Sequence, residues 1–372
     1  MERRVVLLCA GGTGGHLFPA EALAHELVAR GWEVHLATDD RADRYAGKFP
    51  ARAIHIIKSA TPSGKNPIAI SRALWTLWGG YQQSRELIKQ LSPLSVVGFG
   101  GYPTLPPVIA AQRMKVPTLL HDANAIMGRA NRLLAKKADL VAMGFAGASN
   151  TGSGEKPPII TGNPVRPAVL EAAGQPYKTR KKNDPFNLLI FGGSQGAQFF
   201  SQIMPKAIDL LEPAAQAKLR IVHQARPEDE HAVSDYYKRN GVKAEVAPFF
   251  SNMPEKIANS DLVICRAGAS SVSELSVIGR PSILVPFPFA LDHDQAMNAQ
   301  TVASSGGAWI CEQSELSPEK LAERLKNAMD DPKGLALAAE KAKKTGKGNA
   351  AEALADCVEQ VAGLTSTDIT GK

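Results

Sequence analysis

The chain has 372 residues, of which 44% are hydrophobic and 21% are charged, and its formal net charge is +7. This composition excludes a disordered or fibrous chain, and the length suits two domains of roughly 150 to 200 residues each. The positive charge, with a pI near 9.1, favours an anionic partner: nucleic acid, acidic lipid or a phosphorylated small molecule.

The N-terminal segment "MERRVVLLCAGG" contains an apolar run that is too short for an export signal, and we interpret it as a strand. No apolar segment approaches the ~18 to 20 residues of a membrane-spanning helix. The four cysteines lie far apart in sequence, which favours free thiols in a reducing compartment.

Short runs rich in Val, Ile and Leu alternate with longer amphipathic stretches along the chain, which predicts an α/β protein with two parallel sheets. The first half should contain strands at Val5–Cys9, Glu33–Ala37, Ala53–Ile57, Ser95–Phe99, Thr118–His121, Leu140–Met143 and Pro158–Thr161. The second half should contain strands at Asn187–Phe191, Leu219–His223, Ala244–Val246, Leu262–Cys265, Ser282–Val285 and Ala308–Cys311.

Between these halves, residues 166–185 have prolines near both ends and a basic cluster, and we interpret them as a linker with a solvated charged face. We therefore expect one domain over 1–165, a second over 166–345, a C-terminal helix at about 346–363 that packs back on the first domain, and a mobile tail over 364–372.

An internal repeat links the two halves. The segments "VVLLCAGGTGGHLFPAEALA" and "NLLIFGGSQGAQFFSQIMPKA" share the order of apolar strand, Gly-Gly-Ser/Thr-x-Gly and helix. Doubly wound sheets bind ligands beyond the carboxyl ends of their strands, so two such domains facing each other would form one cleft with a glycine turn on each wall. This arrangement suggests two substrates.

A glycine turn that leads into a helix attracts anions, because the first helical N–H groups lack partners and the helix dipole adds positive charge. Candidate turns are Gly11–Gly15, Gly98–Pro103 and Gly192–Gly196. Pro19 is expected in the first helical turn after the first of them. The dinucleotide-binding motif G-x-G-x-x-G is not matched, because Leu17 stands at the position of its third glycine. An NAD-dependent oxidoreductase, with Asp39 contacting the ribose, stays an alternative. No P-loop motif occurs in the sequence.

Further polar clusters follow predicted strands at "HDAN", residues 121–124, and "GNPVR", residues 162–166, and should face the ligands. Glu274 lies one helical turn after Ser270 and Ser271, where its carboxylate suits paired ribose hydroxyls. The alternative for Glu274 is a capping carboxylate near the first turn of its helix.

The motifs "GGTGGHLFPA", "GFGGYP", "HDAN", "GNPVR", "GGSQGA" and "RAGASSVSE…GRPSILVPFPFALDHDQAMNA" together resemble the MurG family of bacterial glycosyltransferases, in the same order and from about residue 4 to about 360. The resemblance implies the GT-B fold of two Rossmann-like, doubly wound parallel-sheet domains facing a cleft. It also implies transfer of N-acetylglucosamine from its UDP donor to undecaprenyl-pyrophosphoryl-N-acetylmuramyl-pentapeptide, within peptidoglycan synthesis, cell-wall biogenesis, cell shape and division.

By this resemblance the second domain binds the donor. Ser194 and Gln195 would take the UDP phosphates, Glu274 the ribose, and Phe249 the uracil face. The expected donor-binding residues are Arg166, Ser194, Gln195, Gly196, Phe249, Phe250, Glu274, Asp294, Gln295 and Asn298. Two core aromatics are the alternative for Phe249 and Phe250.

The first domain would hold the lipid-linked acceptor with its pyrophosphate on the two glycine turns. The expected cleft residues are Thr13, Gly14, Gly15, Gly100, Gly101, Tyr102, His121 and Asn124. Many relatives have His-Glu-Gln-Asn where this chain has "HDAN", so the role of that glutamine is dispensable or shifted here.

No cofactor is expected, because helix N-termini can neutralise the leaving diphosphate. However, Asp294 stands where a glutamine is common in the family, so "DHD" at 292–294 resembles a metal motif of an unrelated transferase architecture. A divalent cation at Asp292 and Asp294 is therefore the alternative to sugar recognition.

The family inverts the anomeric centre: the 4-OH of N-acetylmuramic acid attacks opposite the UDP group and forms a β-1,4 link. Attack needs a base near the hydroxyl. His16, beside the first glycine turn, is the candidate base, with hydrogen bonding to the acceptor pyrophosphate as its alternative role. Asp122 and His121 are the second choices.

The segment 66–90 places apolar side chains at helical spacing among basic residues, as in segments that lie on membranes. A core-facing stripe explains the spacing equally well, and Gly79 with Gly80 weakens a single long helix there. The expected membrane residues are Ile70, Leu74, Leu77, Trp78 and Tyr81.

We therefore expect a cytoplasmic protein bound peripherally to the inner face of the plasma membrane. Its partners would be UDP-N-acetylglucosamine, the lipid-linked muramyl-pentapeptide, an anionic membrane surface and other cell-wall synthesis proteins, with no nucleic acid. The alternatives are a UDP-N-acetylglucosamine epimerase of the same architecture and a non-catalytic membrane-recruitment subunit.

Overall fold

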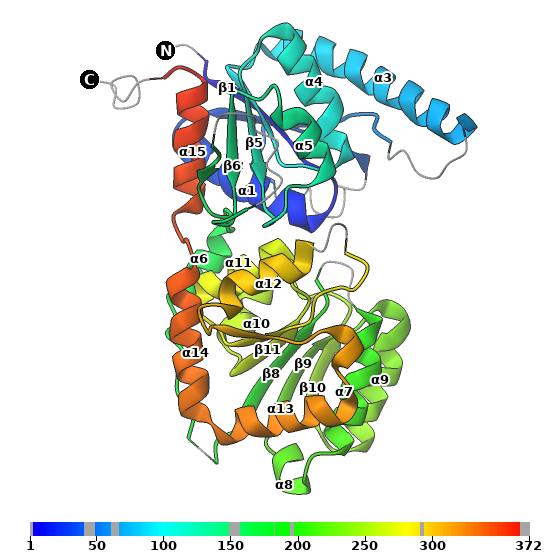
Figure 1. Ribbon diagram of the computed structural model, residues 1–372, viewed down its shortest axis with the longest axis vertical. Helices are drawn as coiled ribbons and strands as arrows, with labels where there is room; N and C mark the ends of the chain where they lie inside the picture. The colour runs from blue at the N-terminus through cyan, green and yellow to red at the C-terminus, as the bar shows by residue number, and fades with distance from the viewer. Residues whose placement is uncertain are drawn as a thin grey trace. The chain divides into compact units, whose positions relative to one another are not determined.

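The computed structural model describes residues 3–40, 49–60, 67–148, 157–181, 183–193, 197–290 and 294–364. The chain forms two compact units, which Figure 1 shows: unit 1 comprises Met1–Arg166 and Gly348–Lys372, and unit 2 comprises Pro167–Lys347. The boundary lies one residue after the expected one. Nearly all of the expected tail lies outside the described residues, and the expected cleft stays a prediction.

Within its described residues, unit 1 contains one parallel sheet of seven strands in the order β3-β2-β1-β4-β5-β6-β7. The strands are β1 Val5–Cys9, β2 Glu33–Thr38, β3 Ala53–Ile56, β4 Ser95–Gly98, β5 Thr118–Asp122, β6 Leu140–Met143 and β7 Ile159–Ile160. The helices are α1 Gly14–Ala29, α3 Pro67–Leu91, η2 Tyr102–Thr104, α4 Leu105–Met114, α5 Arg129–Ala135 and α15 Ala350–Val361.

Helices cover both faces of this sheet (Figure 1), so its strands are apolar on both sides. In β1, Val6 and Leu8 belong to the core cluster that contains α1 and α15, whereas Leu7 and Cys9 belong to the cluster on the opposite face. The alternation follows from the two-residue period of a strand. All four cysteines are buried free thiols.

The C-terminal helix α15 packs against α1 and completes the core of unit 1 with Leu354 and Val358. Arg30, at the end of α1, donates hydrogen bonds to Asp356 and Glu359, both at 2.7 Å. The Glu359 side chain is buried, so this ion pair is shielded from solvent and fixes where α15 docks.

The described part of unit 2 contains a parallel sheet of six strands in the order β10-β9-β8-β11-β12-β13. The strands are β8 Phe186–Phe191, β9 Leu219–Gln224, β10 Lys243–Ala247, β11 Leu262–Cys265, β12 Ser282–Leu284 and β13 Ala308–Ile310. The helices are α6 Pro167–Ala173, α7 Gln198–Asp209, α8 Pro213–Gln216, α9 Pro227–Arg239, α10 Met253–Ala258, α11 Ala269–Ile278, α12 Asp294–Ala303, η4 Gln313–Glu315, α13 Pro318–Asp330 and α14 Pro332–Thr345.

The parallel pairing and all thirteen expected strands are confirmed, each strand within one residue of its expected ends. Two local expectations are wrong. Helix α1 begins at Gly14, so Pro19 lies inside the helix rather than in its first turn. Proline has no backbone N–H, so the Gly15 carbonyl does not receive the i→i−4 hydrogen bond that another residue at position 19 would donate. In the expected linker, Arg180 is buried, bonds to the Met329 carbonyl and stacks on Phe186, so the basic cluster is not a uniformly solvated face.

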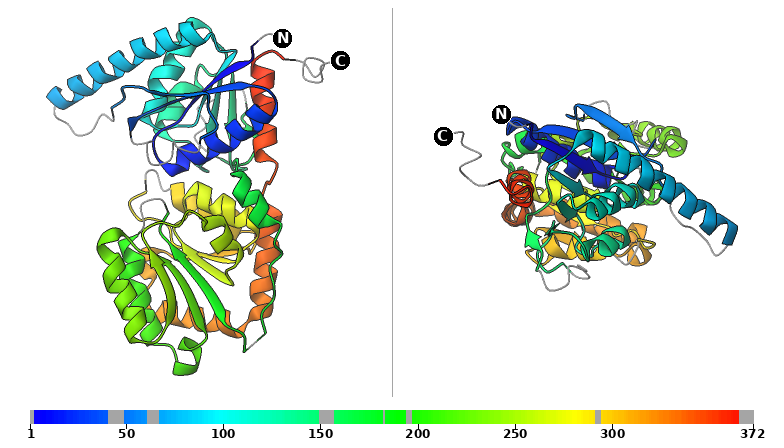
Figure 2. Two further views of the ribbon diagram at one scale, coloured as in Figure 1. Left: turned by 180° about the vertical axis from the view of Figure 1, so that it is seen from behind. Right: turned by 90° about the horizontal axis from the view of Figure 1, so that it is seen from above.

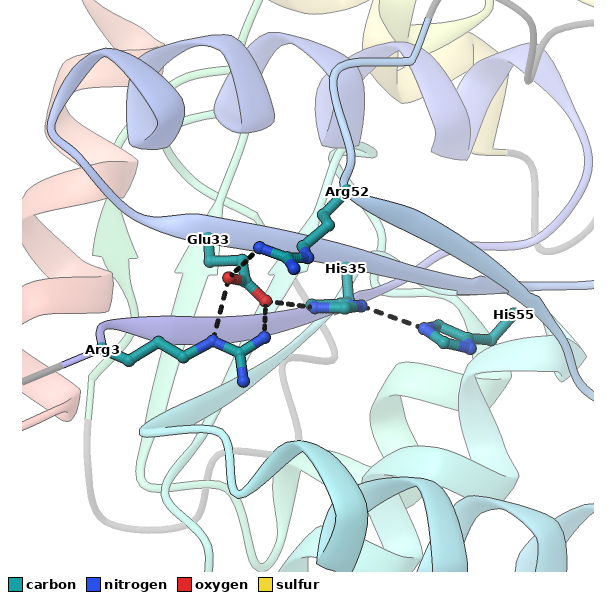
Figure 3. A network of polar contacts seen from close by, with 5 residues as sticks. All are labelled: Arg3, Glu33, His35, Arg52 and His55. Carbon is teal, nitrogen blue, oxygen red and sulfur yellow. Dashed lines mark hydrogen bonds and ion pairs between the residues drawn. The ribbon is translucent and has the colours of Figure 1, made fainter.

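A polar network lies on β2 and β3, away from the glycine turns (Figure 3). Glu33 accepts hydrogen bonds from Arg3 and from Arg52, and His35 joins Glu33 Oε1 to His55 through its two ring nitrogens at 2.9 and 3.0 Å. The Arg3 hydrogen bond, with His35 and Arg52, lowers the pKa of the Glu33 carboxyl to about 2. The network ties together the edge of the sheet where its strands begin.

Helix α3 is continuous through Gly79 and Gly80, and its N-terminal half extends past the rest of unit 1 (Figure 2). A Cβ on Gly80 would lie 2.0 Å from the Lys58 carbonyl oxygen. The glycine therefore allows close packing of α3 on the segment after β3, which compensates for its low helix propensity.

Candidate functional site

Each sheet has one topological switch point, where the chain leaves a central strand toward one side and later returns on the other. In unit 1 this point lies between β1 and β4, and in unit 2 between β8 and β11. Open α/β sheets bind ligands at such points, outside the carboxyl ends of the strands. The loops that follow these four strands are therefore the candidate sites.

The loop after β1 brings Thr13 and His16 together. Thr13 is the N-cap of α1, and its Oγ1 lies 3.1 Å from His16 Nδ1. Gly14 is the first helical residue, and Gly15 is exposed beside it, where an added Cβ would meet no atom within 4 Å. The start of α1 therefore presents N–H groups and a held imidazole on one turn.

The loop after β4 packs directly against the loop after β1, as expected. Gly11 N–H donates to the Gly100 carbonyl at 3.2 Å. Gly100 and Gly101 have φ of +95° and +80°, and a Cβ on Gly100 would lie 3.3 Å from His16 Nε2. Only glycine fits this backbone and this approach. Tyr102, which begins η2, is half-buried against the core.

His121, at the end of β5, is fully buried. Its Nε2 lies 3.1 Å from the Gly162 carbonyl, whereas Nδ1 is buried without a hydrogen-bond partner among the described residues. Burial lowers the pKa of the His121 imidazole to about 4. A neutral, inaccessible ring connects β5 to the loop after β7 and is poorly placed to contact a substrate.

Asp122 is 4% exposed, and its carboxylate accepts hydrogen bonds from Asn124 N, Gly128 N and Asn131 Nδ2 at 2.9 to 3.0 Å. Burial raises the pKa of this carboxyl. These contacts favour a positioning role over the catalytic one expected from the sequence, because both oxygens hold the loop that carries Asn124. Asn131, which sequence reasoning missed, is buried next to Gly100.

Arg166 is the last residue of unit 1, and its guanidinium lies 3.9 Å from the ring centroid of Phe18 in α1. Arg166, which the sequence predicted to bind the donor, therefore lies against Phe18 of α1, the helix that follows the first glycine turn. The sequence gives no sign of this contact, because 147 residues separate the two positions.

In unit 2 the loop after β8 begins with Gly192 and Gly193, and Gly193 has a φ of +87°. Three expected phosphate-binding residues, Ser194, Gln195 and Gly196, lie outside the described residues, and their role stays a prediction.

The loop after β11 leads into α11, whose sixth residue is Glu274. Glu274 is buried, and the Ser270 hydroxyl at the start of the helix is buried without a hydrogen-bond partner among the described residues. Arg266 is held by the carbonyls of Val285 and Pro286 and by Gln313 Oε1 at 2.6 Å. Burial lowers the pKa of the Arg266 guanidinium to about 10.

The two aromatic residues after β10 differ in exposure. Phe249 is 57% exposed, which disagrees with a core role and leaves its ring available to a planar ligand. Phe250 is buried, with the Lys256 ammonium 5.4 Å from its ring centroid.

Helix α12 begins at Asp294. Gln295 Oε1 accepts a hydrogen bond from Phe287 N at 3.0 Å and thereby holds the loop after β12. Asn298 is fully buried, and its Nδ2 donates to the Ala267 carbonyl at 3.3 Å. Asn298 thus ties α12 to the loop that precedes α11.

No three His, Cys, Asp or Glu side chains are grouped for a metal within the described residues. Asp292 lies outside them, so the cation considered for Asp292 and Asp294 stays untested.

The expected membrane segment is exposed toward the start of α3. Trp75 and Trp78 are 72% and 55% exposed and meet edge to face, with ring centroids 5.6 Å apart. Leu77 is half-buried, and Tyr81 packs against the core, with the guanidinium carbons of Arg85 and Arg113 at 5.9 and 5.6 Å from its ring centroid. The other large apolar side chains exposed in the described part of α3 are Ile68, Ile70 and Leu74. Within the described residues, no helix has the length and apolar character needed to span a bilayer.

Comparison with known proteins matches residues 6–143 to the glycosyltransferase family 28 N-terminal domain and residues 187–359 to the family's C-terminal domain. Two curated relatives carry the name UDP-N-acetylglucosamine–N-acetylmuramyl-(pentapeptide) pyrophosphoryl-undecaprenol N-acetylglucosamine transferase. One, from Rhizobium rhizogenes, is 55% identical over 98% of each chain, and one, from Mesorhizobium japonicum, is 57% identical over 97% of this chain and 96% of its own.

Among solved structures, MurG of Acinetobacter baumannii matches 96% of this chain and 99% of its own at 28% identity, with a TM-score of 0.75. A glycosyltransferase of kitacinnamycin, at 16% identity and a TM-score of 0.70, shares the fold.

Proposed function

The chain belongs to glycosyltransferase family 28, and from this membership we propose that it transfers N-acetylglucosamine from UDP-N-acetylglucosamine to undecaprenyl-pyrophosphoryl-N-acetylmuramyl-pentapeptide, in peptidoglycan synthesis. The identity to the named transferases over nearly the whole chain carries the proposal. The glycine turns at both switch points support it, because the donor and the acceptor each contain a diphosphate.

Unit 2 takes the donor in this proposal. The buried Glu274 accepts the ribose hydroxyls, and Ser270, whose hydroxyl has no partner among the described residues, donates to a phosphate oxygen at the start of α11. The exposed ring of Phe249 covers the uracil. Ser194, Gln195 and Gly196 complete the phosphate site, and Asp294 reads the sugar.

Unit 1 takes the acceptor, with its pyrophosphate on the adjoining turns after β1 and β4. The N–H groups at the start of α1 supply the positive potential. The hydrogen bonds to Asp122 hold the loop of Asn124 at the same edge of the sheet.

His16 acts as the general base in this proposal. When Nδ1–H donates to the Thr13 hydroxyl, Nε2 is the basic atom and takes the proton of the attacking 4-OH. The new C1–O bond forms as the bond to UDP breaks on the opposite face, and the released diphosphate charge is stabilised by helix N-termini without a metal.

The exposed part of α3 binds an anionic membrane surface and brings the enzyme to its lipid-linked acceptor. The helix itself contains Arg72, Arg85 and Lys89 against one acidic residue, Glu86, so its own net charge is positive. Each basic residue near an anionic surface contributes about 1 kcal/mol, and tryptophan is enriched at membrane interfaces.

Vesicle co-sedimentation tests the membrane contact. The double variant Trp75→Glu, Trp78→Glu should lose binding to vesicles of anionic lipid, whereas Leu337→Glu, at an exposed leucine of unit 2, should keep it. Equal binding of both variants would reject α3 as the contact.

A transfer assay tests the reaction. Radiolabelled UDP-N-acetylglucosamine is incubated with the lipid-linked muramyl-pentapeptide, with and without a chelator, using the wild type, His16→Ala and Glu274→Ala. We expect chelator-insensitive label in the lipid product, a loss of turnover in His16→Ala and a raised donor KM in Glu274→Ala. Unchanged turnover in His16→Ala would remove His16 as the base, and inhibition by the chelator would favour a cation at Asp294.

A further inference from the structure

Two histidines on neighbouring strands of unit 1 bond directly to each other (Figure 3). His35 of β2 pairs in register with Ala53 of β3, and His55 follows two residues later, so both side chains lie on the same face of the sheet. His35 is buried and His55 is half-buried. The pair lies at the β3 edge of the sheet, and the transfer reaction proposed above makes no use of it.

The two rings meet along a straight line. His35 Nδ1 and His55 Nε2 are 3.0 Å apart, and the ring centroids are 5.3 Å apart, which is close to that distance plus the two ring radii. Each nitrogen therefore directs its lone pair or its hydrogen at the other, as in an N–H···N hydrogen bond. Two imidazoles that share a metal ion instead aim both lone pairs at a common point to one side. The geometry fits a proton between the rings.

Glu33 decides which nitrogen of His35 carries a hydrogen. Its Oε1 lies 2.9 Å from His35 Nε2, and the hydrogen bond from Arg3 is the largest cause that lowers the pKa of the Glu33 carboxyl to about 2. A carboxylate only accepts, so His35 Nε2–H donates to it. His35 Nδ1 then accepts from His55 Nε2–H, and His55 Nδ1 is the basic atom that remains.

The first added proton keeps the hydrogen bond between the rings, and the second breaks it. A proton on His55 Nδ1 leaves one hydrogen between the rings, and the positive charge can pass to His35, beside the Glu33 carboxylate. A second proton must bind His35 Nδ1, which gives up its bond to His55 Nε2–H in doing so. Two N–H groups would then face each other, and the rings must separate.

The other charges of the network oppose the second proton. Arg3 and Arg52 both donate to Glu33, so two guanidinium groups already surround one carboxylate. Burial, and after it the charge of His35, lowers the pKa of the His55 imidazole. Like charges at this spacing separate the two protonation steps of a coupled pair.

Helix α3 packs on this face of the sheet, with Ile88 in the same core cluster as Ala37 of β2. The charged side chains in this half of the helix are Arg85, Glu86 and Lys89. Glu86 Oε1 lies 3.2 Å from Lys89 Nζ, so this carboxylate already faces a cation. Lys58, two residues after β3, is a further cation against α3. These groups therefore also disfavour the doubly charged form of the pair.

We propose that His35 and His55 form a pH-sensitive latch that holds β3 on β2, closed with no added proton or one, and open when a second proton binds. As an edge strand, β3 pairs only with β2 among the described strands. Gln83 of α3 bonds to the Ile56 carbonyl at 2.6 Å and to the Lys58 N–H at 3.2 Å. Opening of the latch therefore loosens the segment on which α3 is seated. This device is independent of the transfer reaction.

An NMR titration of the full chain, labelled with ¹⁵N at histidine, tests the shared proton. The shifts of both rings should follow the same two steps, about one pH unit or more apart. In His55→Gln, whose amide can still donate to Nδ1, His35 should titrate in one step. His25→Gln, at an exposed histidine of α1, should leave both steps unchanged. Independent single steps for the two rings would overturn the shared proton.

Hydrogen exchange over the same pH range tests the latch. Protection of the β3 amides should fall tenfold or more as the pH drops through the lower step, whereas the amides of the central strand β4 keep theirs. His55→Gln should abolish this pH dependence. Unchanged protection at β3 would overturn the latch, and so would an equal loss at β3 and β4, which indicates global unfolding. If thermal melts show that His55→Gln does not fold, the comparison of β3 with β4 in the wild type decides alone.

Discussion

Replacing Gly100 with alanine should damage both stability and activity, because two separate costs meet at this residue. Its φ of +95° lies in the left-handed region, which costs an alanine about 1–2 kcal/mol. The added Cβ would also lie 3.2 Å from Asn131 Nδ2 and 3.3 Å from the His16 ring, so these groups must move by a few tenths of an ångström. Such a displacement of the base should lower kcat/KM by about tenfold or more.

Gly31→Ala is the matched control, because Gly31 has a φ of +80° and its Cβ would meet nothing within 4 Å. Thermal melts should show a loss of roughly 2–8 °C in Tm for Gly31→Ala from the backbone cost alone, and a loss at least as large for Gly100→Ala. Initial rates of sugar transfer should fall only in Gly100→Ala. Equal activity of the two variants would refute the placement of His16 against this glycine.

Three further outcomes are expected. Gly80→Ala should destabilise the fold by about 1–3 kcal/mol, because the added Cβ overpacks against the Lys58 carbonyl. Gly79→Ala, whose Cβ would meet only Lys58 Cδ at 3.9 Å, should stabilise the fold by up to about 1 kcal/mol. Changes in the free energy of unfolding that have the same sign in both variants, measured by urea denaturation, would contradict the packing of α3. Arg30→Met should cost about 3 kcal/mol because it leaves Glu359 buried without its cation, and Arg30→Met with Glu359→Met should recover much of that loss in the same denaturation assay. Burial lowers the pKa values of His121 and His223 to about 4, so the unfolded chain binds a proton at each of these histidines near pH 6.5 and the folded chain does not. The free energy of unfolding should therefore be greatest above pH 6.5 and decline as the pH falls toward 4, by up to about 3 kcal/mol for each histidine. Titration of either ring near pH 6.5 in an NMR experiment on the folded protein would contradict this.

The positions of the strands and of the glycine turns could be predicted from the sequence, because each produces a recognisable pattern over a few neighbouring residues. Buried parallel strands appear as short apolar runs, and turns with positive φ, such as that of Gly100 and Gly101, require glycine. The switch points then follow from strand order, which places the two turns of unit 1 side by side.

Contacts between distant segments were not predictable in this way. The buried carboxylate of Asp122 is held by donors from a loop and a helix, and the contact of Arg166 with Phe18 joins α1 to the residue that precedes unit 2. The exposure of Phe249 and of the tryptophans in α3 is likewise a property of packing, because the same helical or strand spacing suits a core residue.

The stoichiometry of UDP release tests the central claim most directly. With purified enzyme and UDP-N-acetylglucosamine, one UDP should be released for each N-acetylglucosamine found on the lipid-linked muramyl-pentapeptide, and none when that lipid is omitted. Release of UDP, or conversion of the donor to another sugar nucleotide, at the same rate without the lipid would contradict the account.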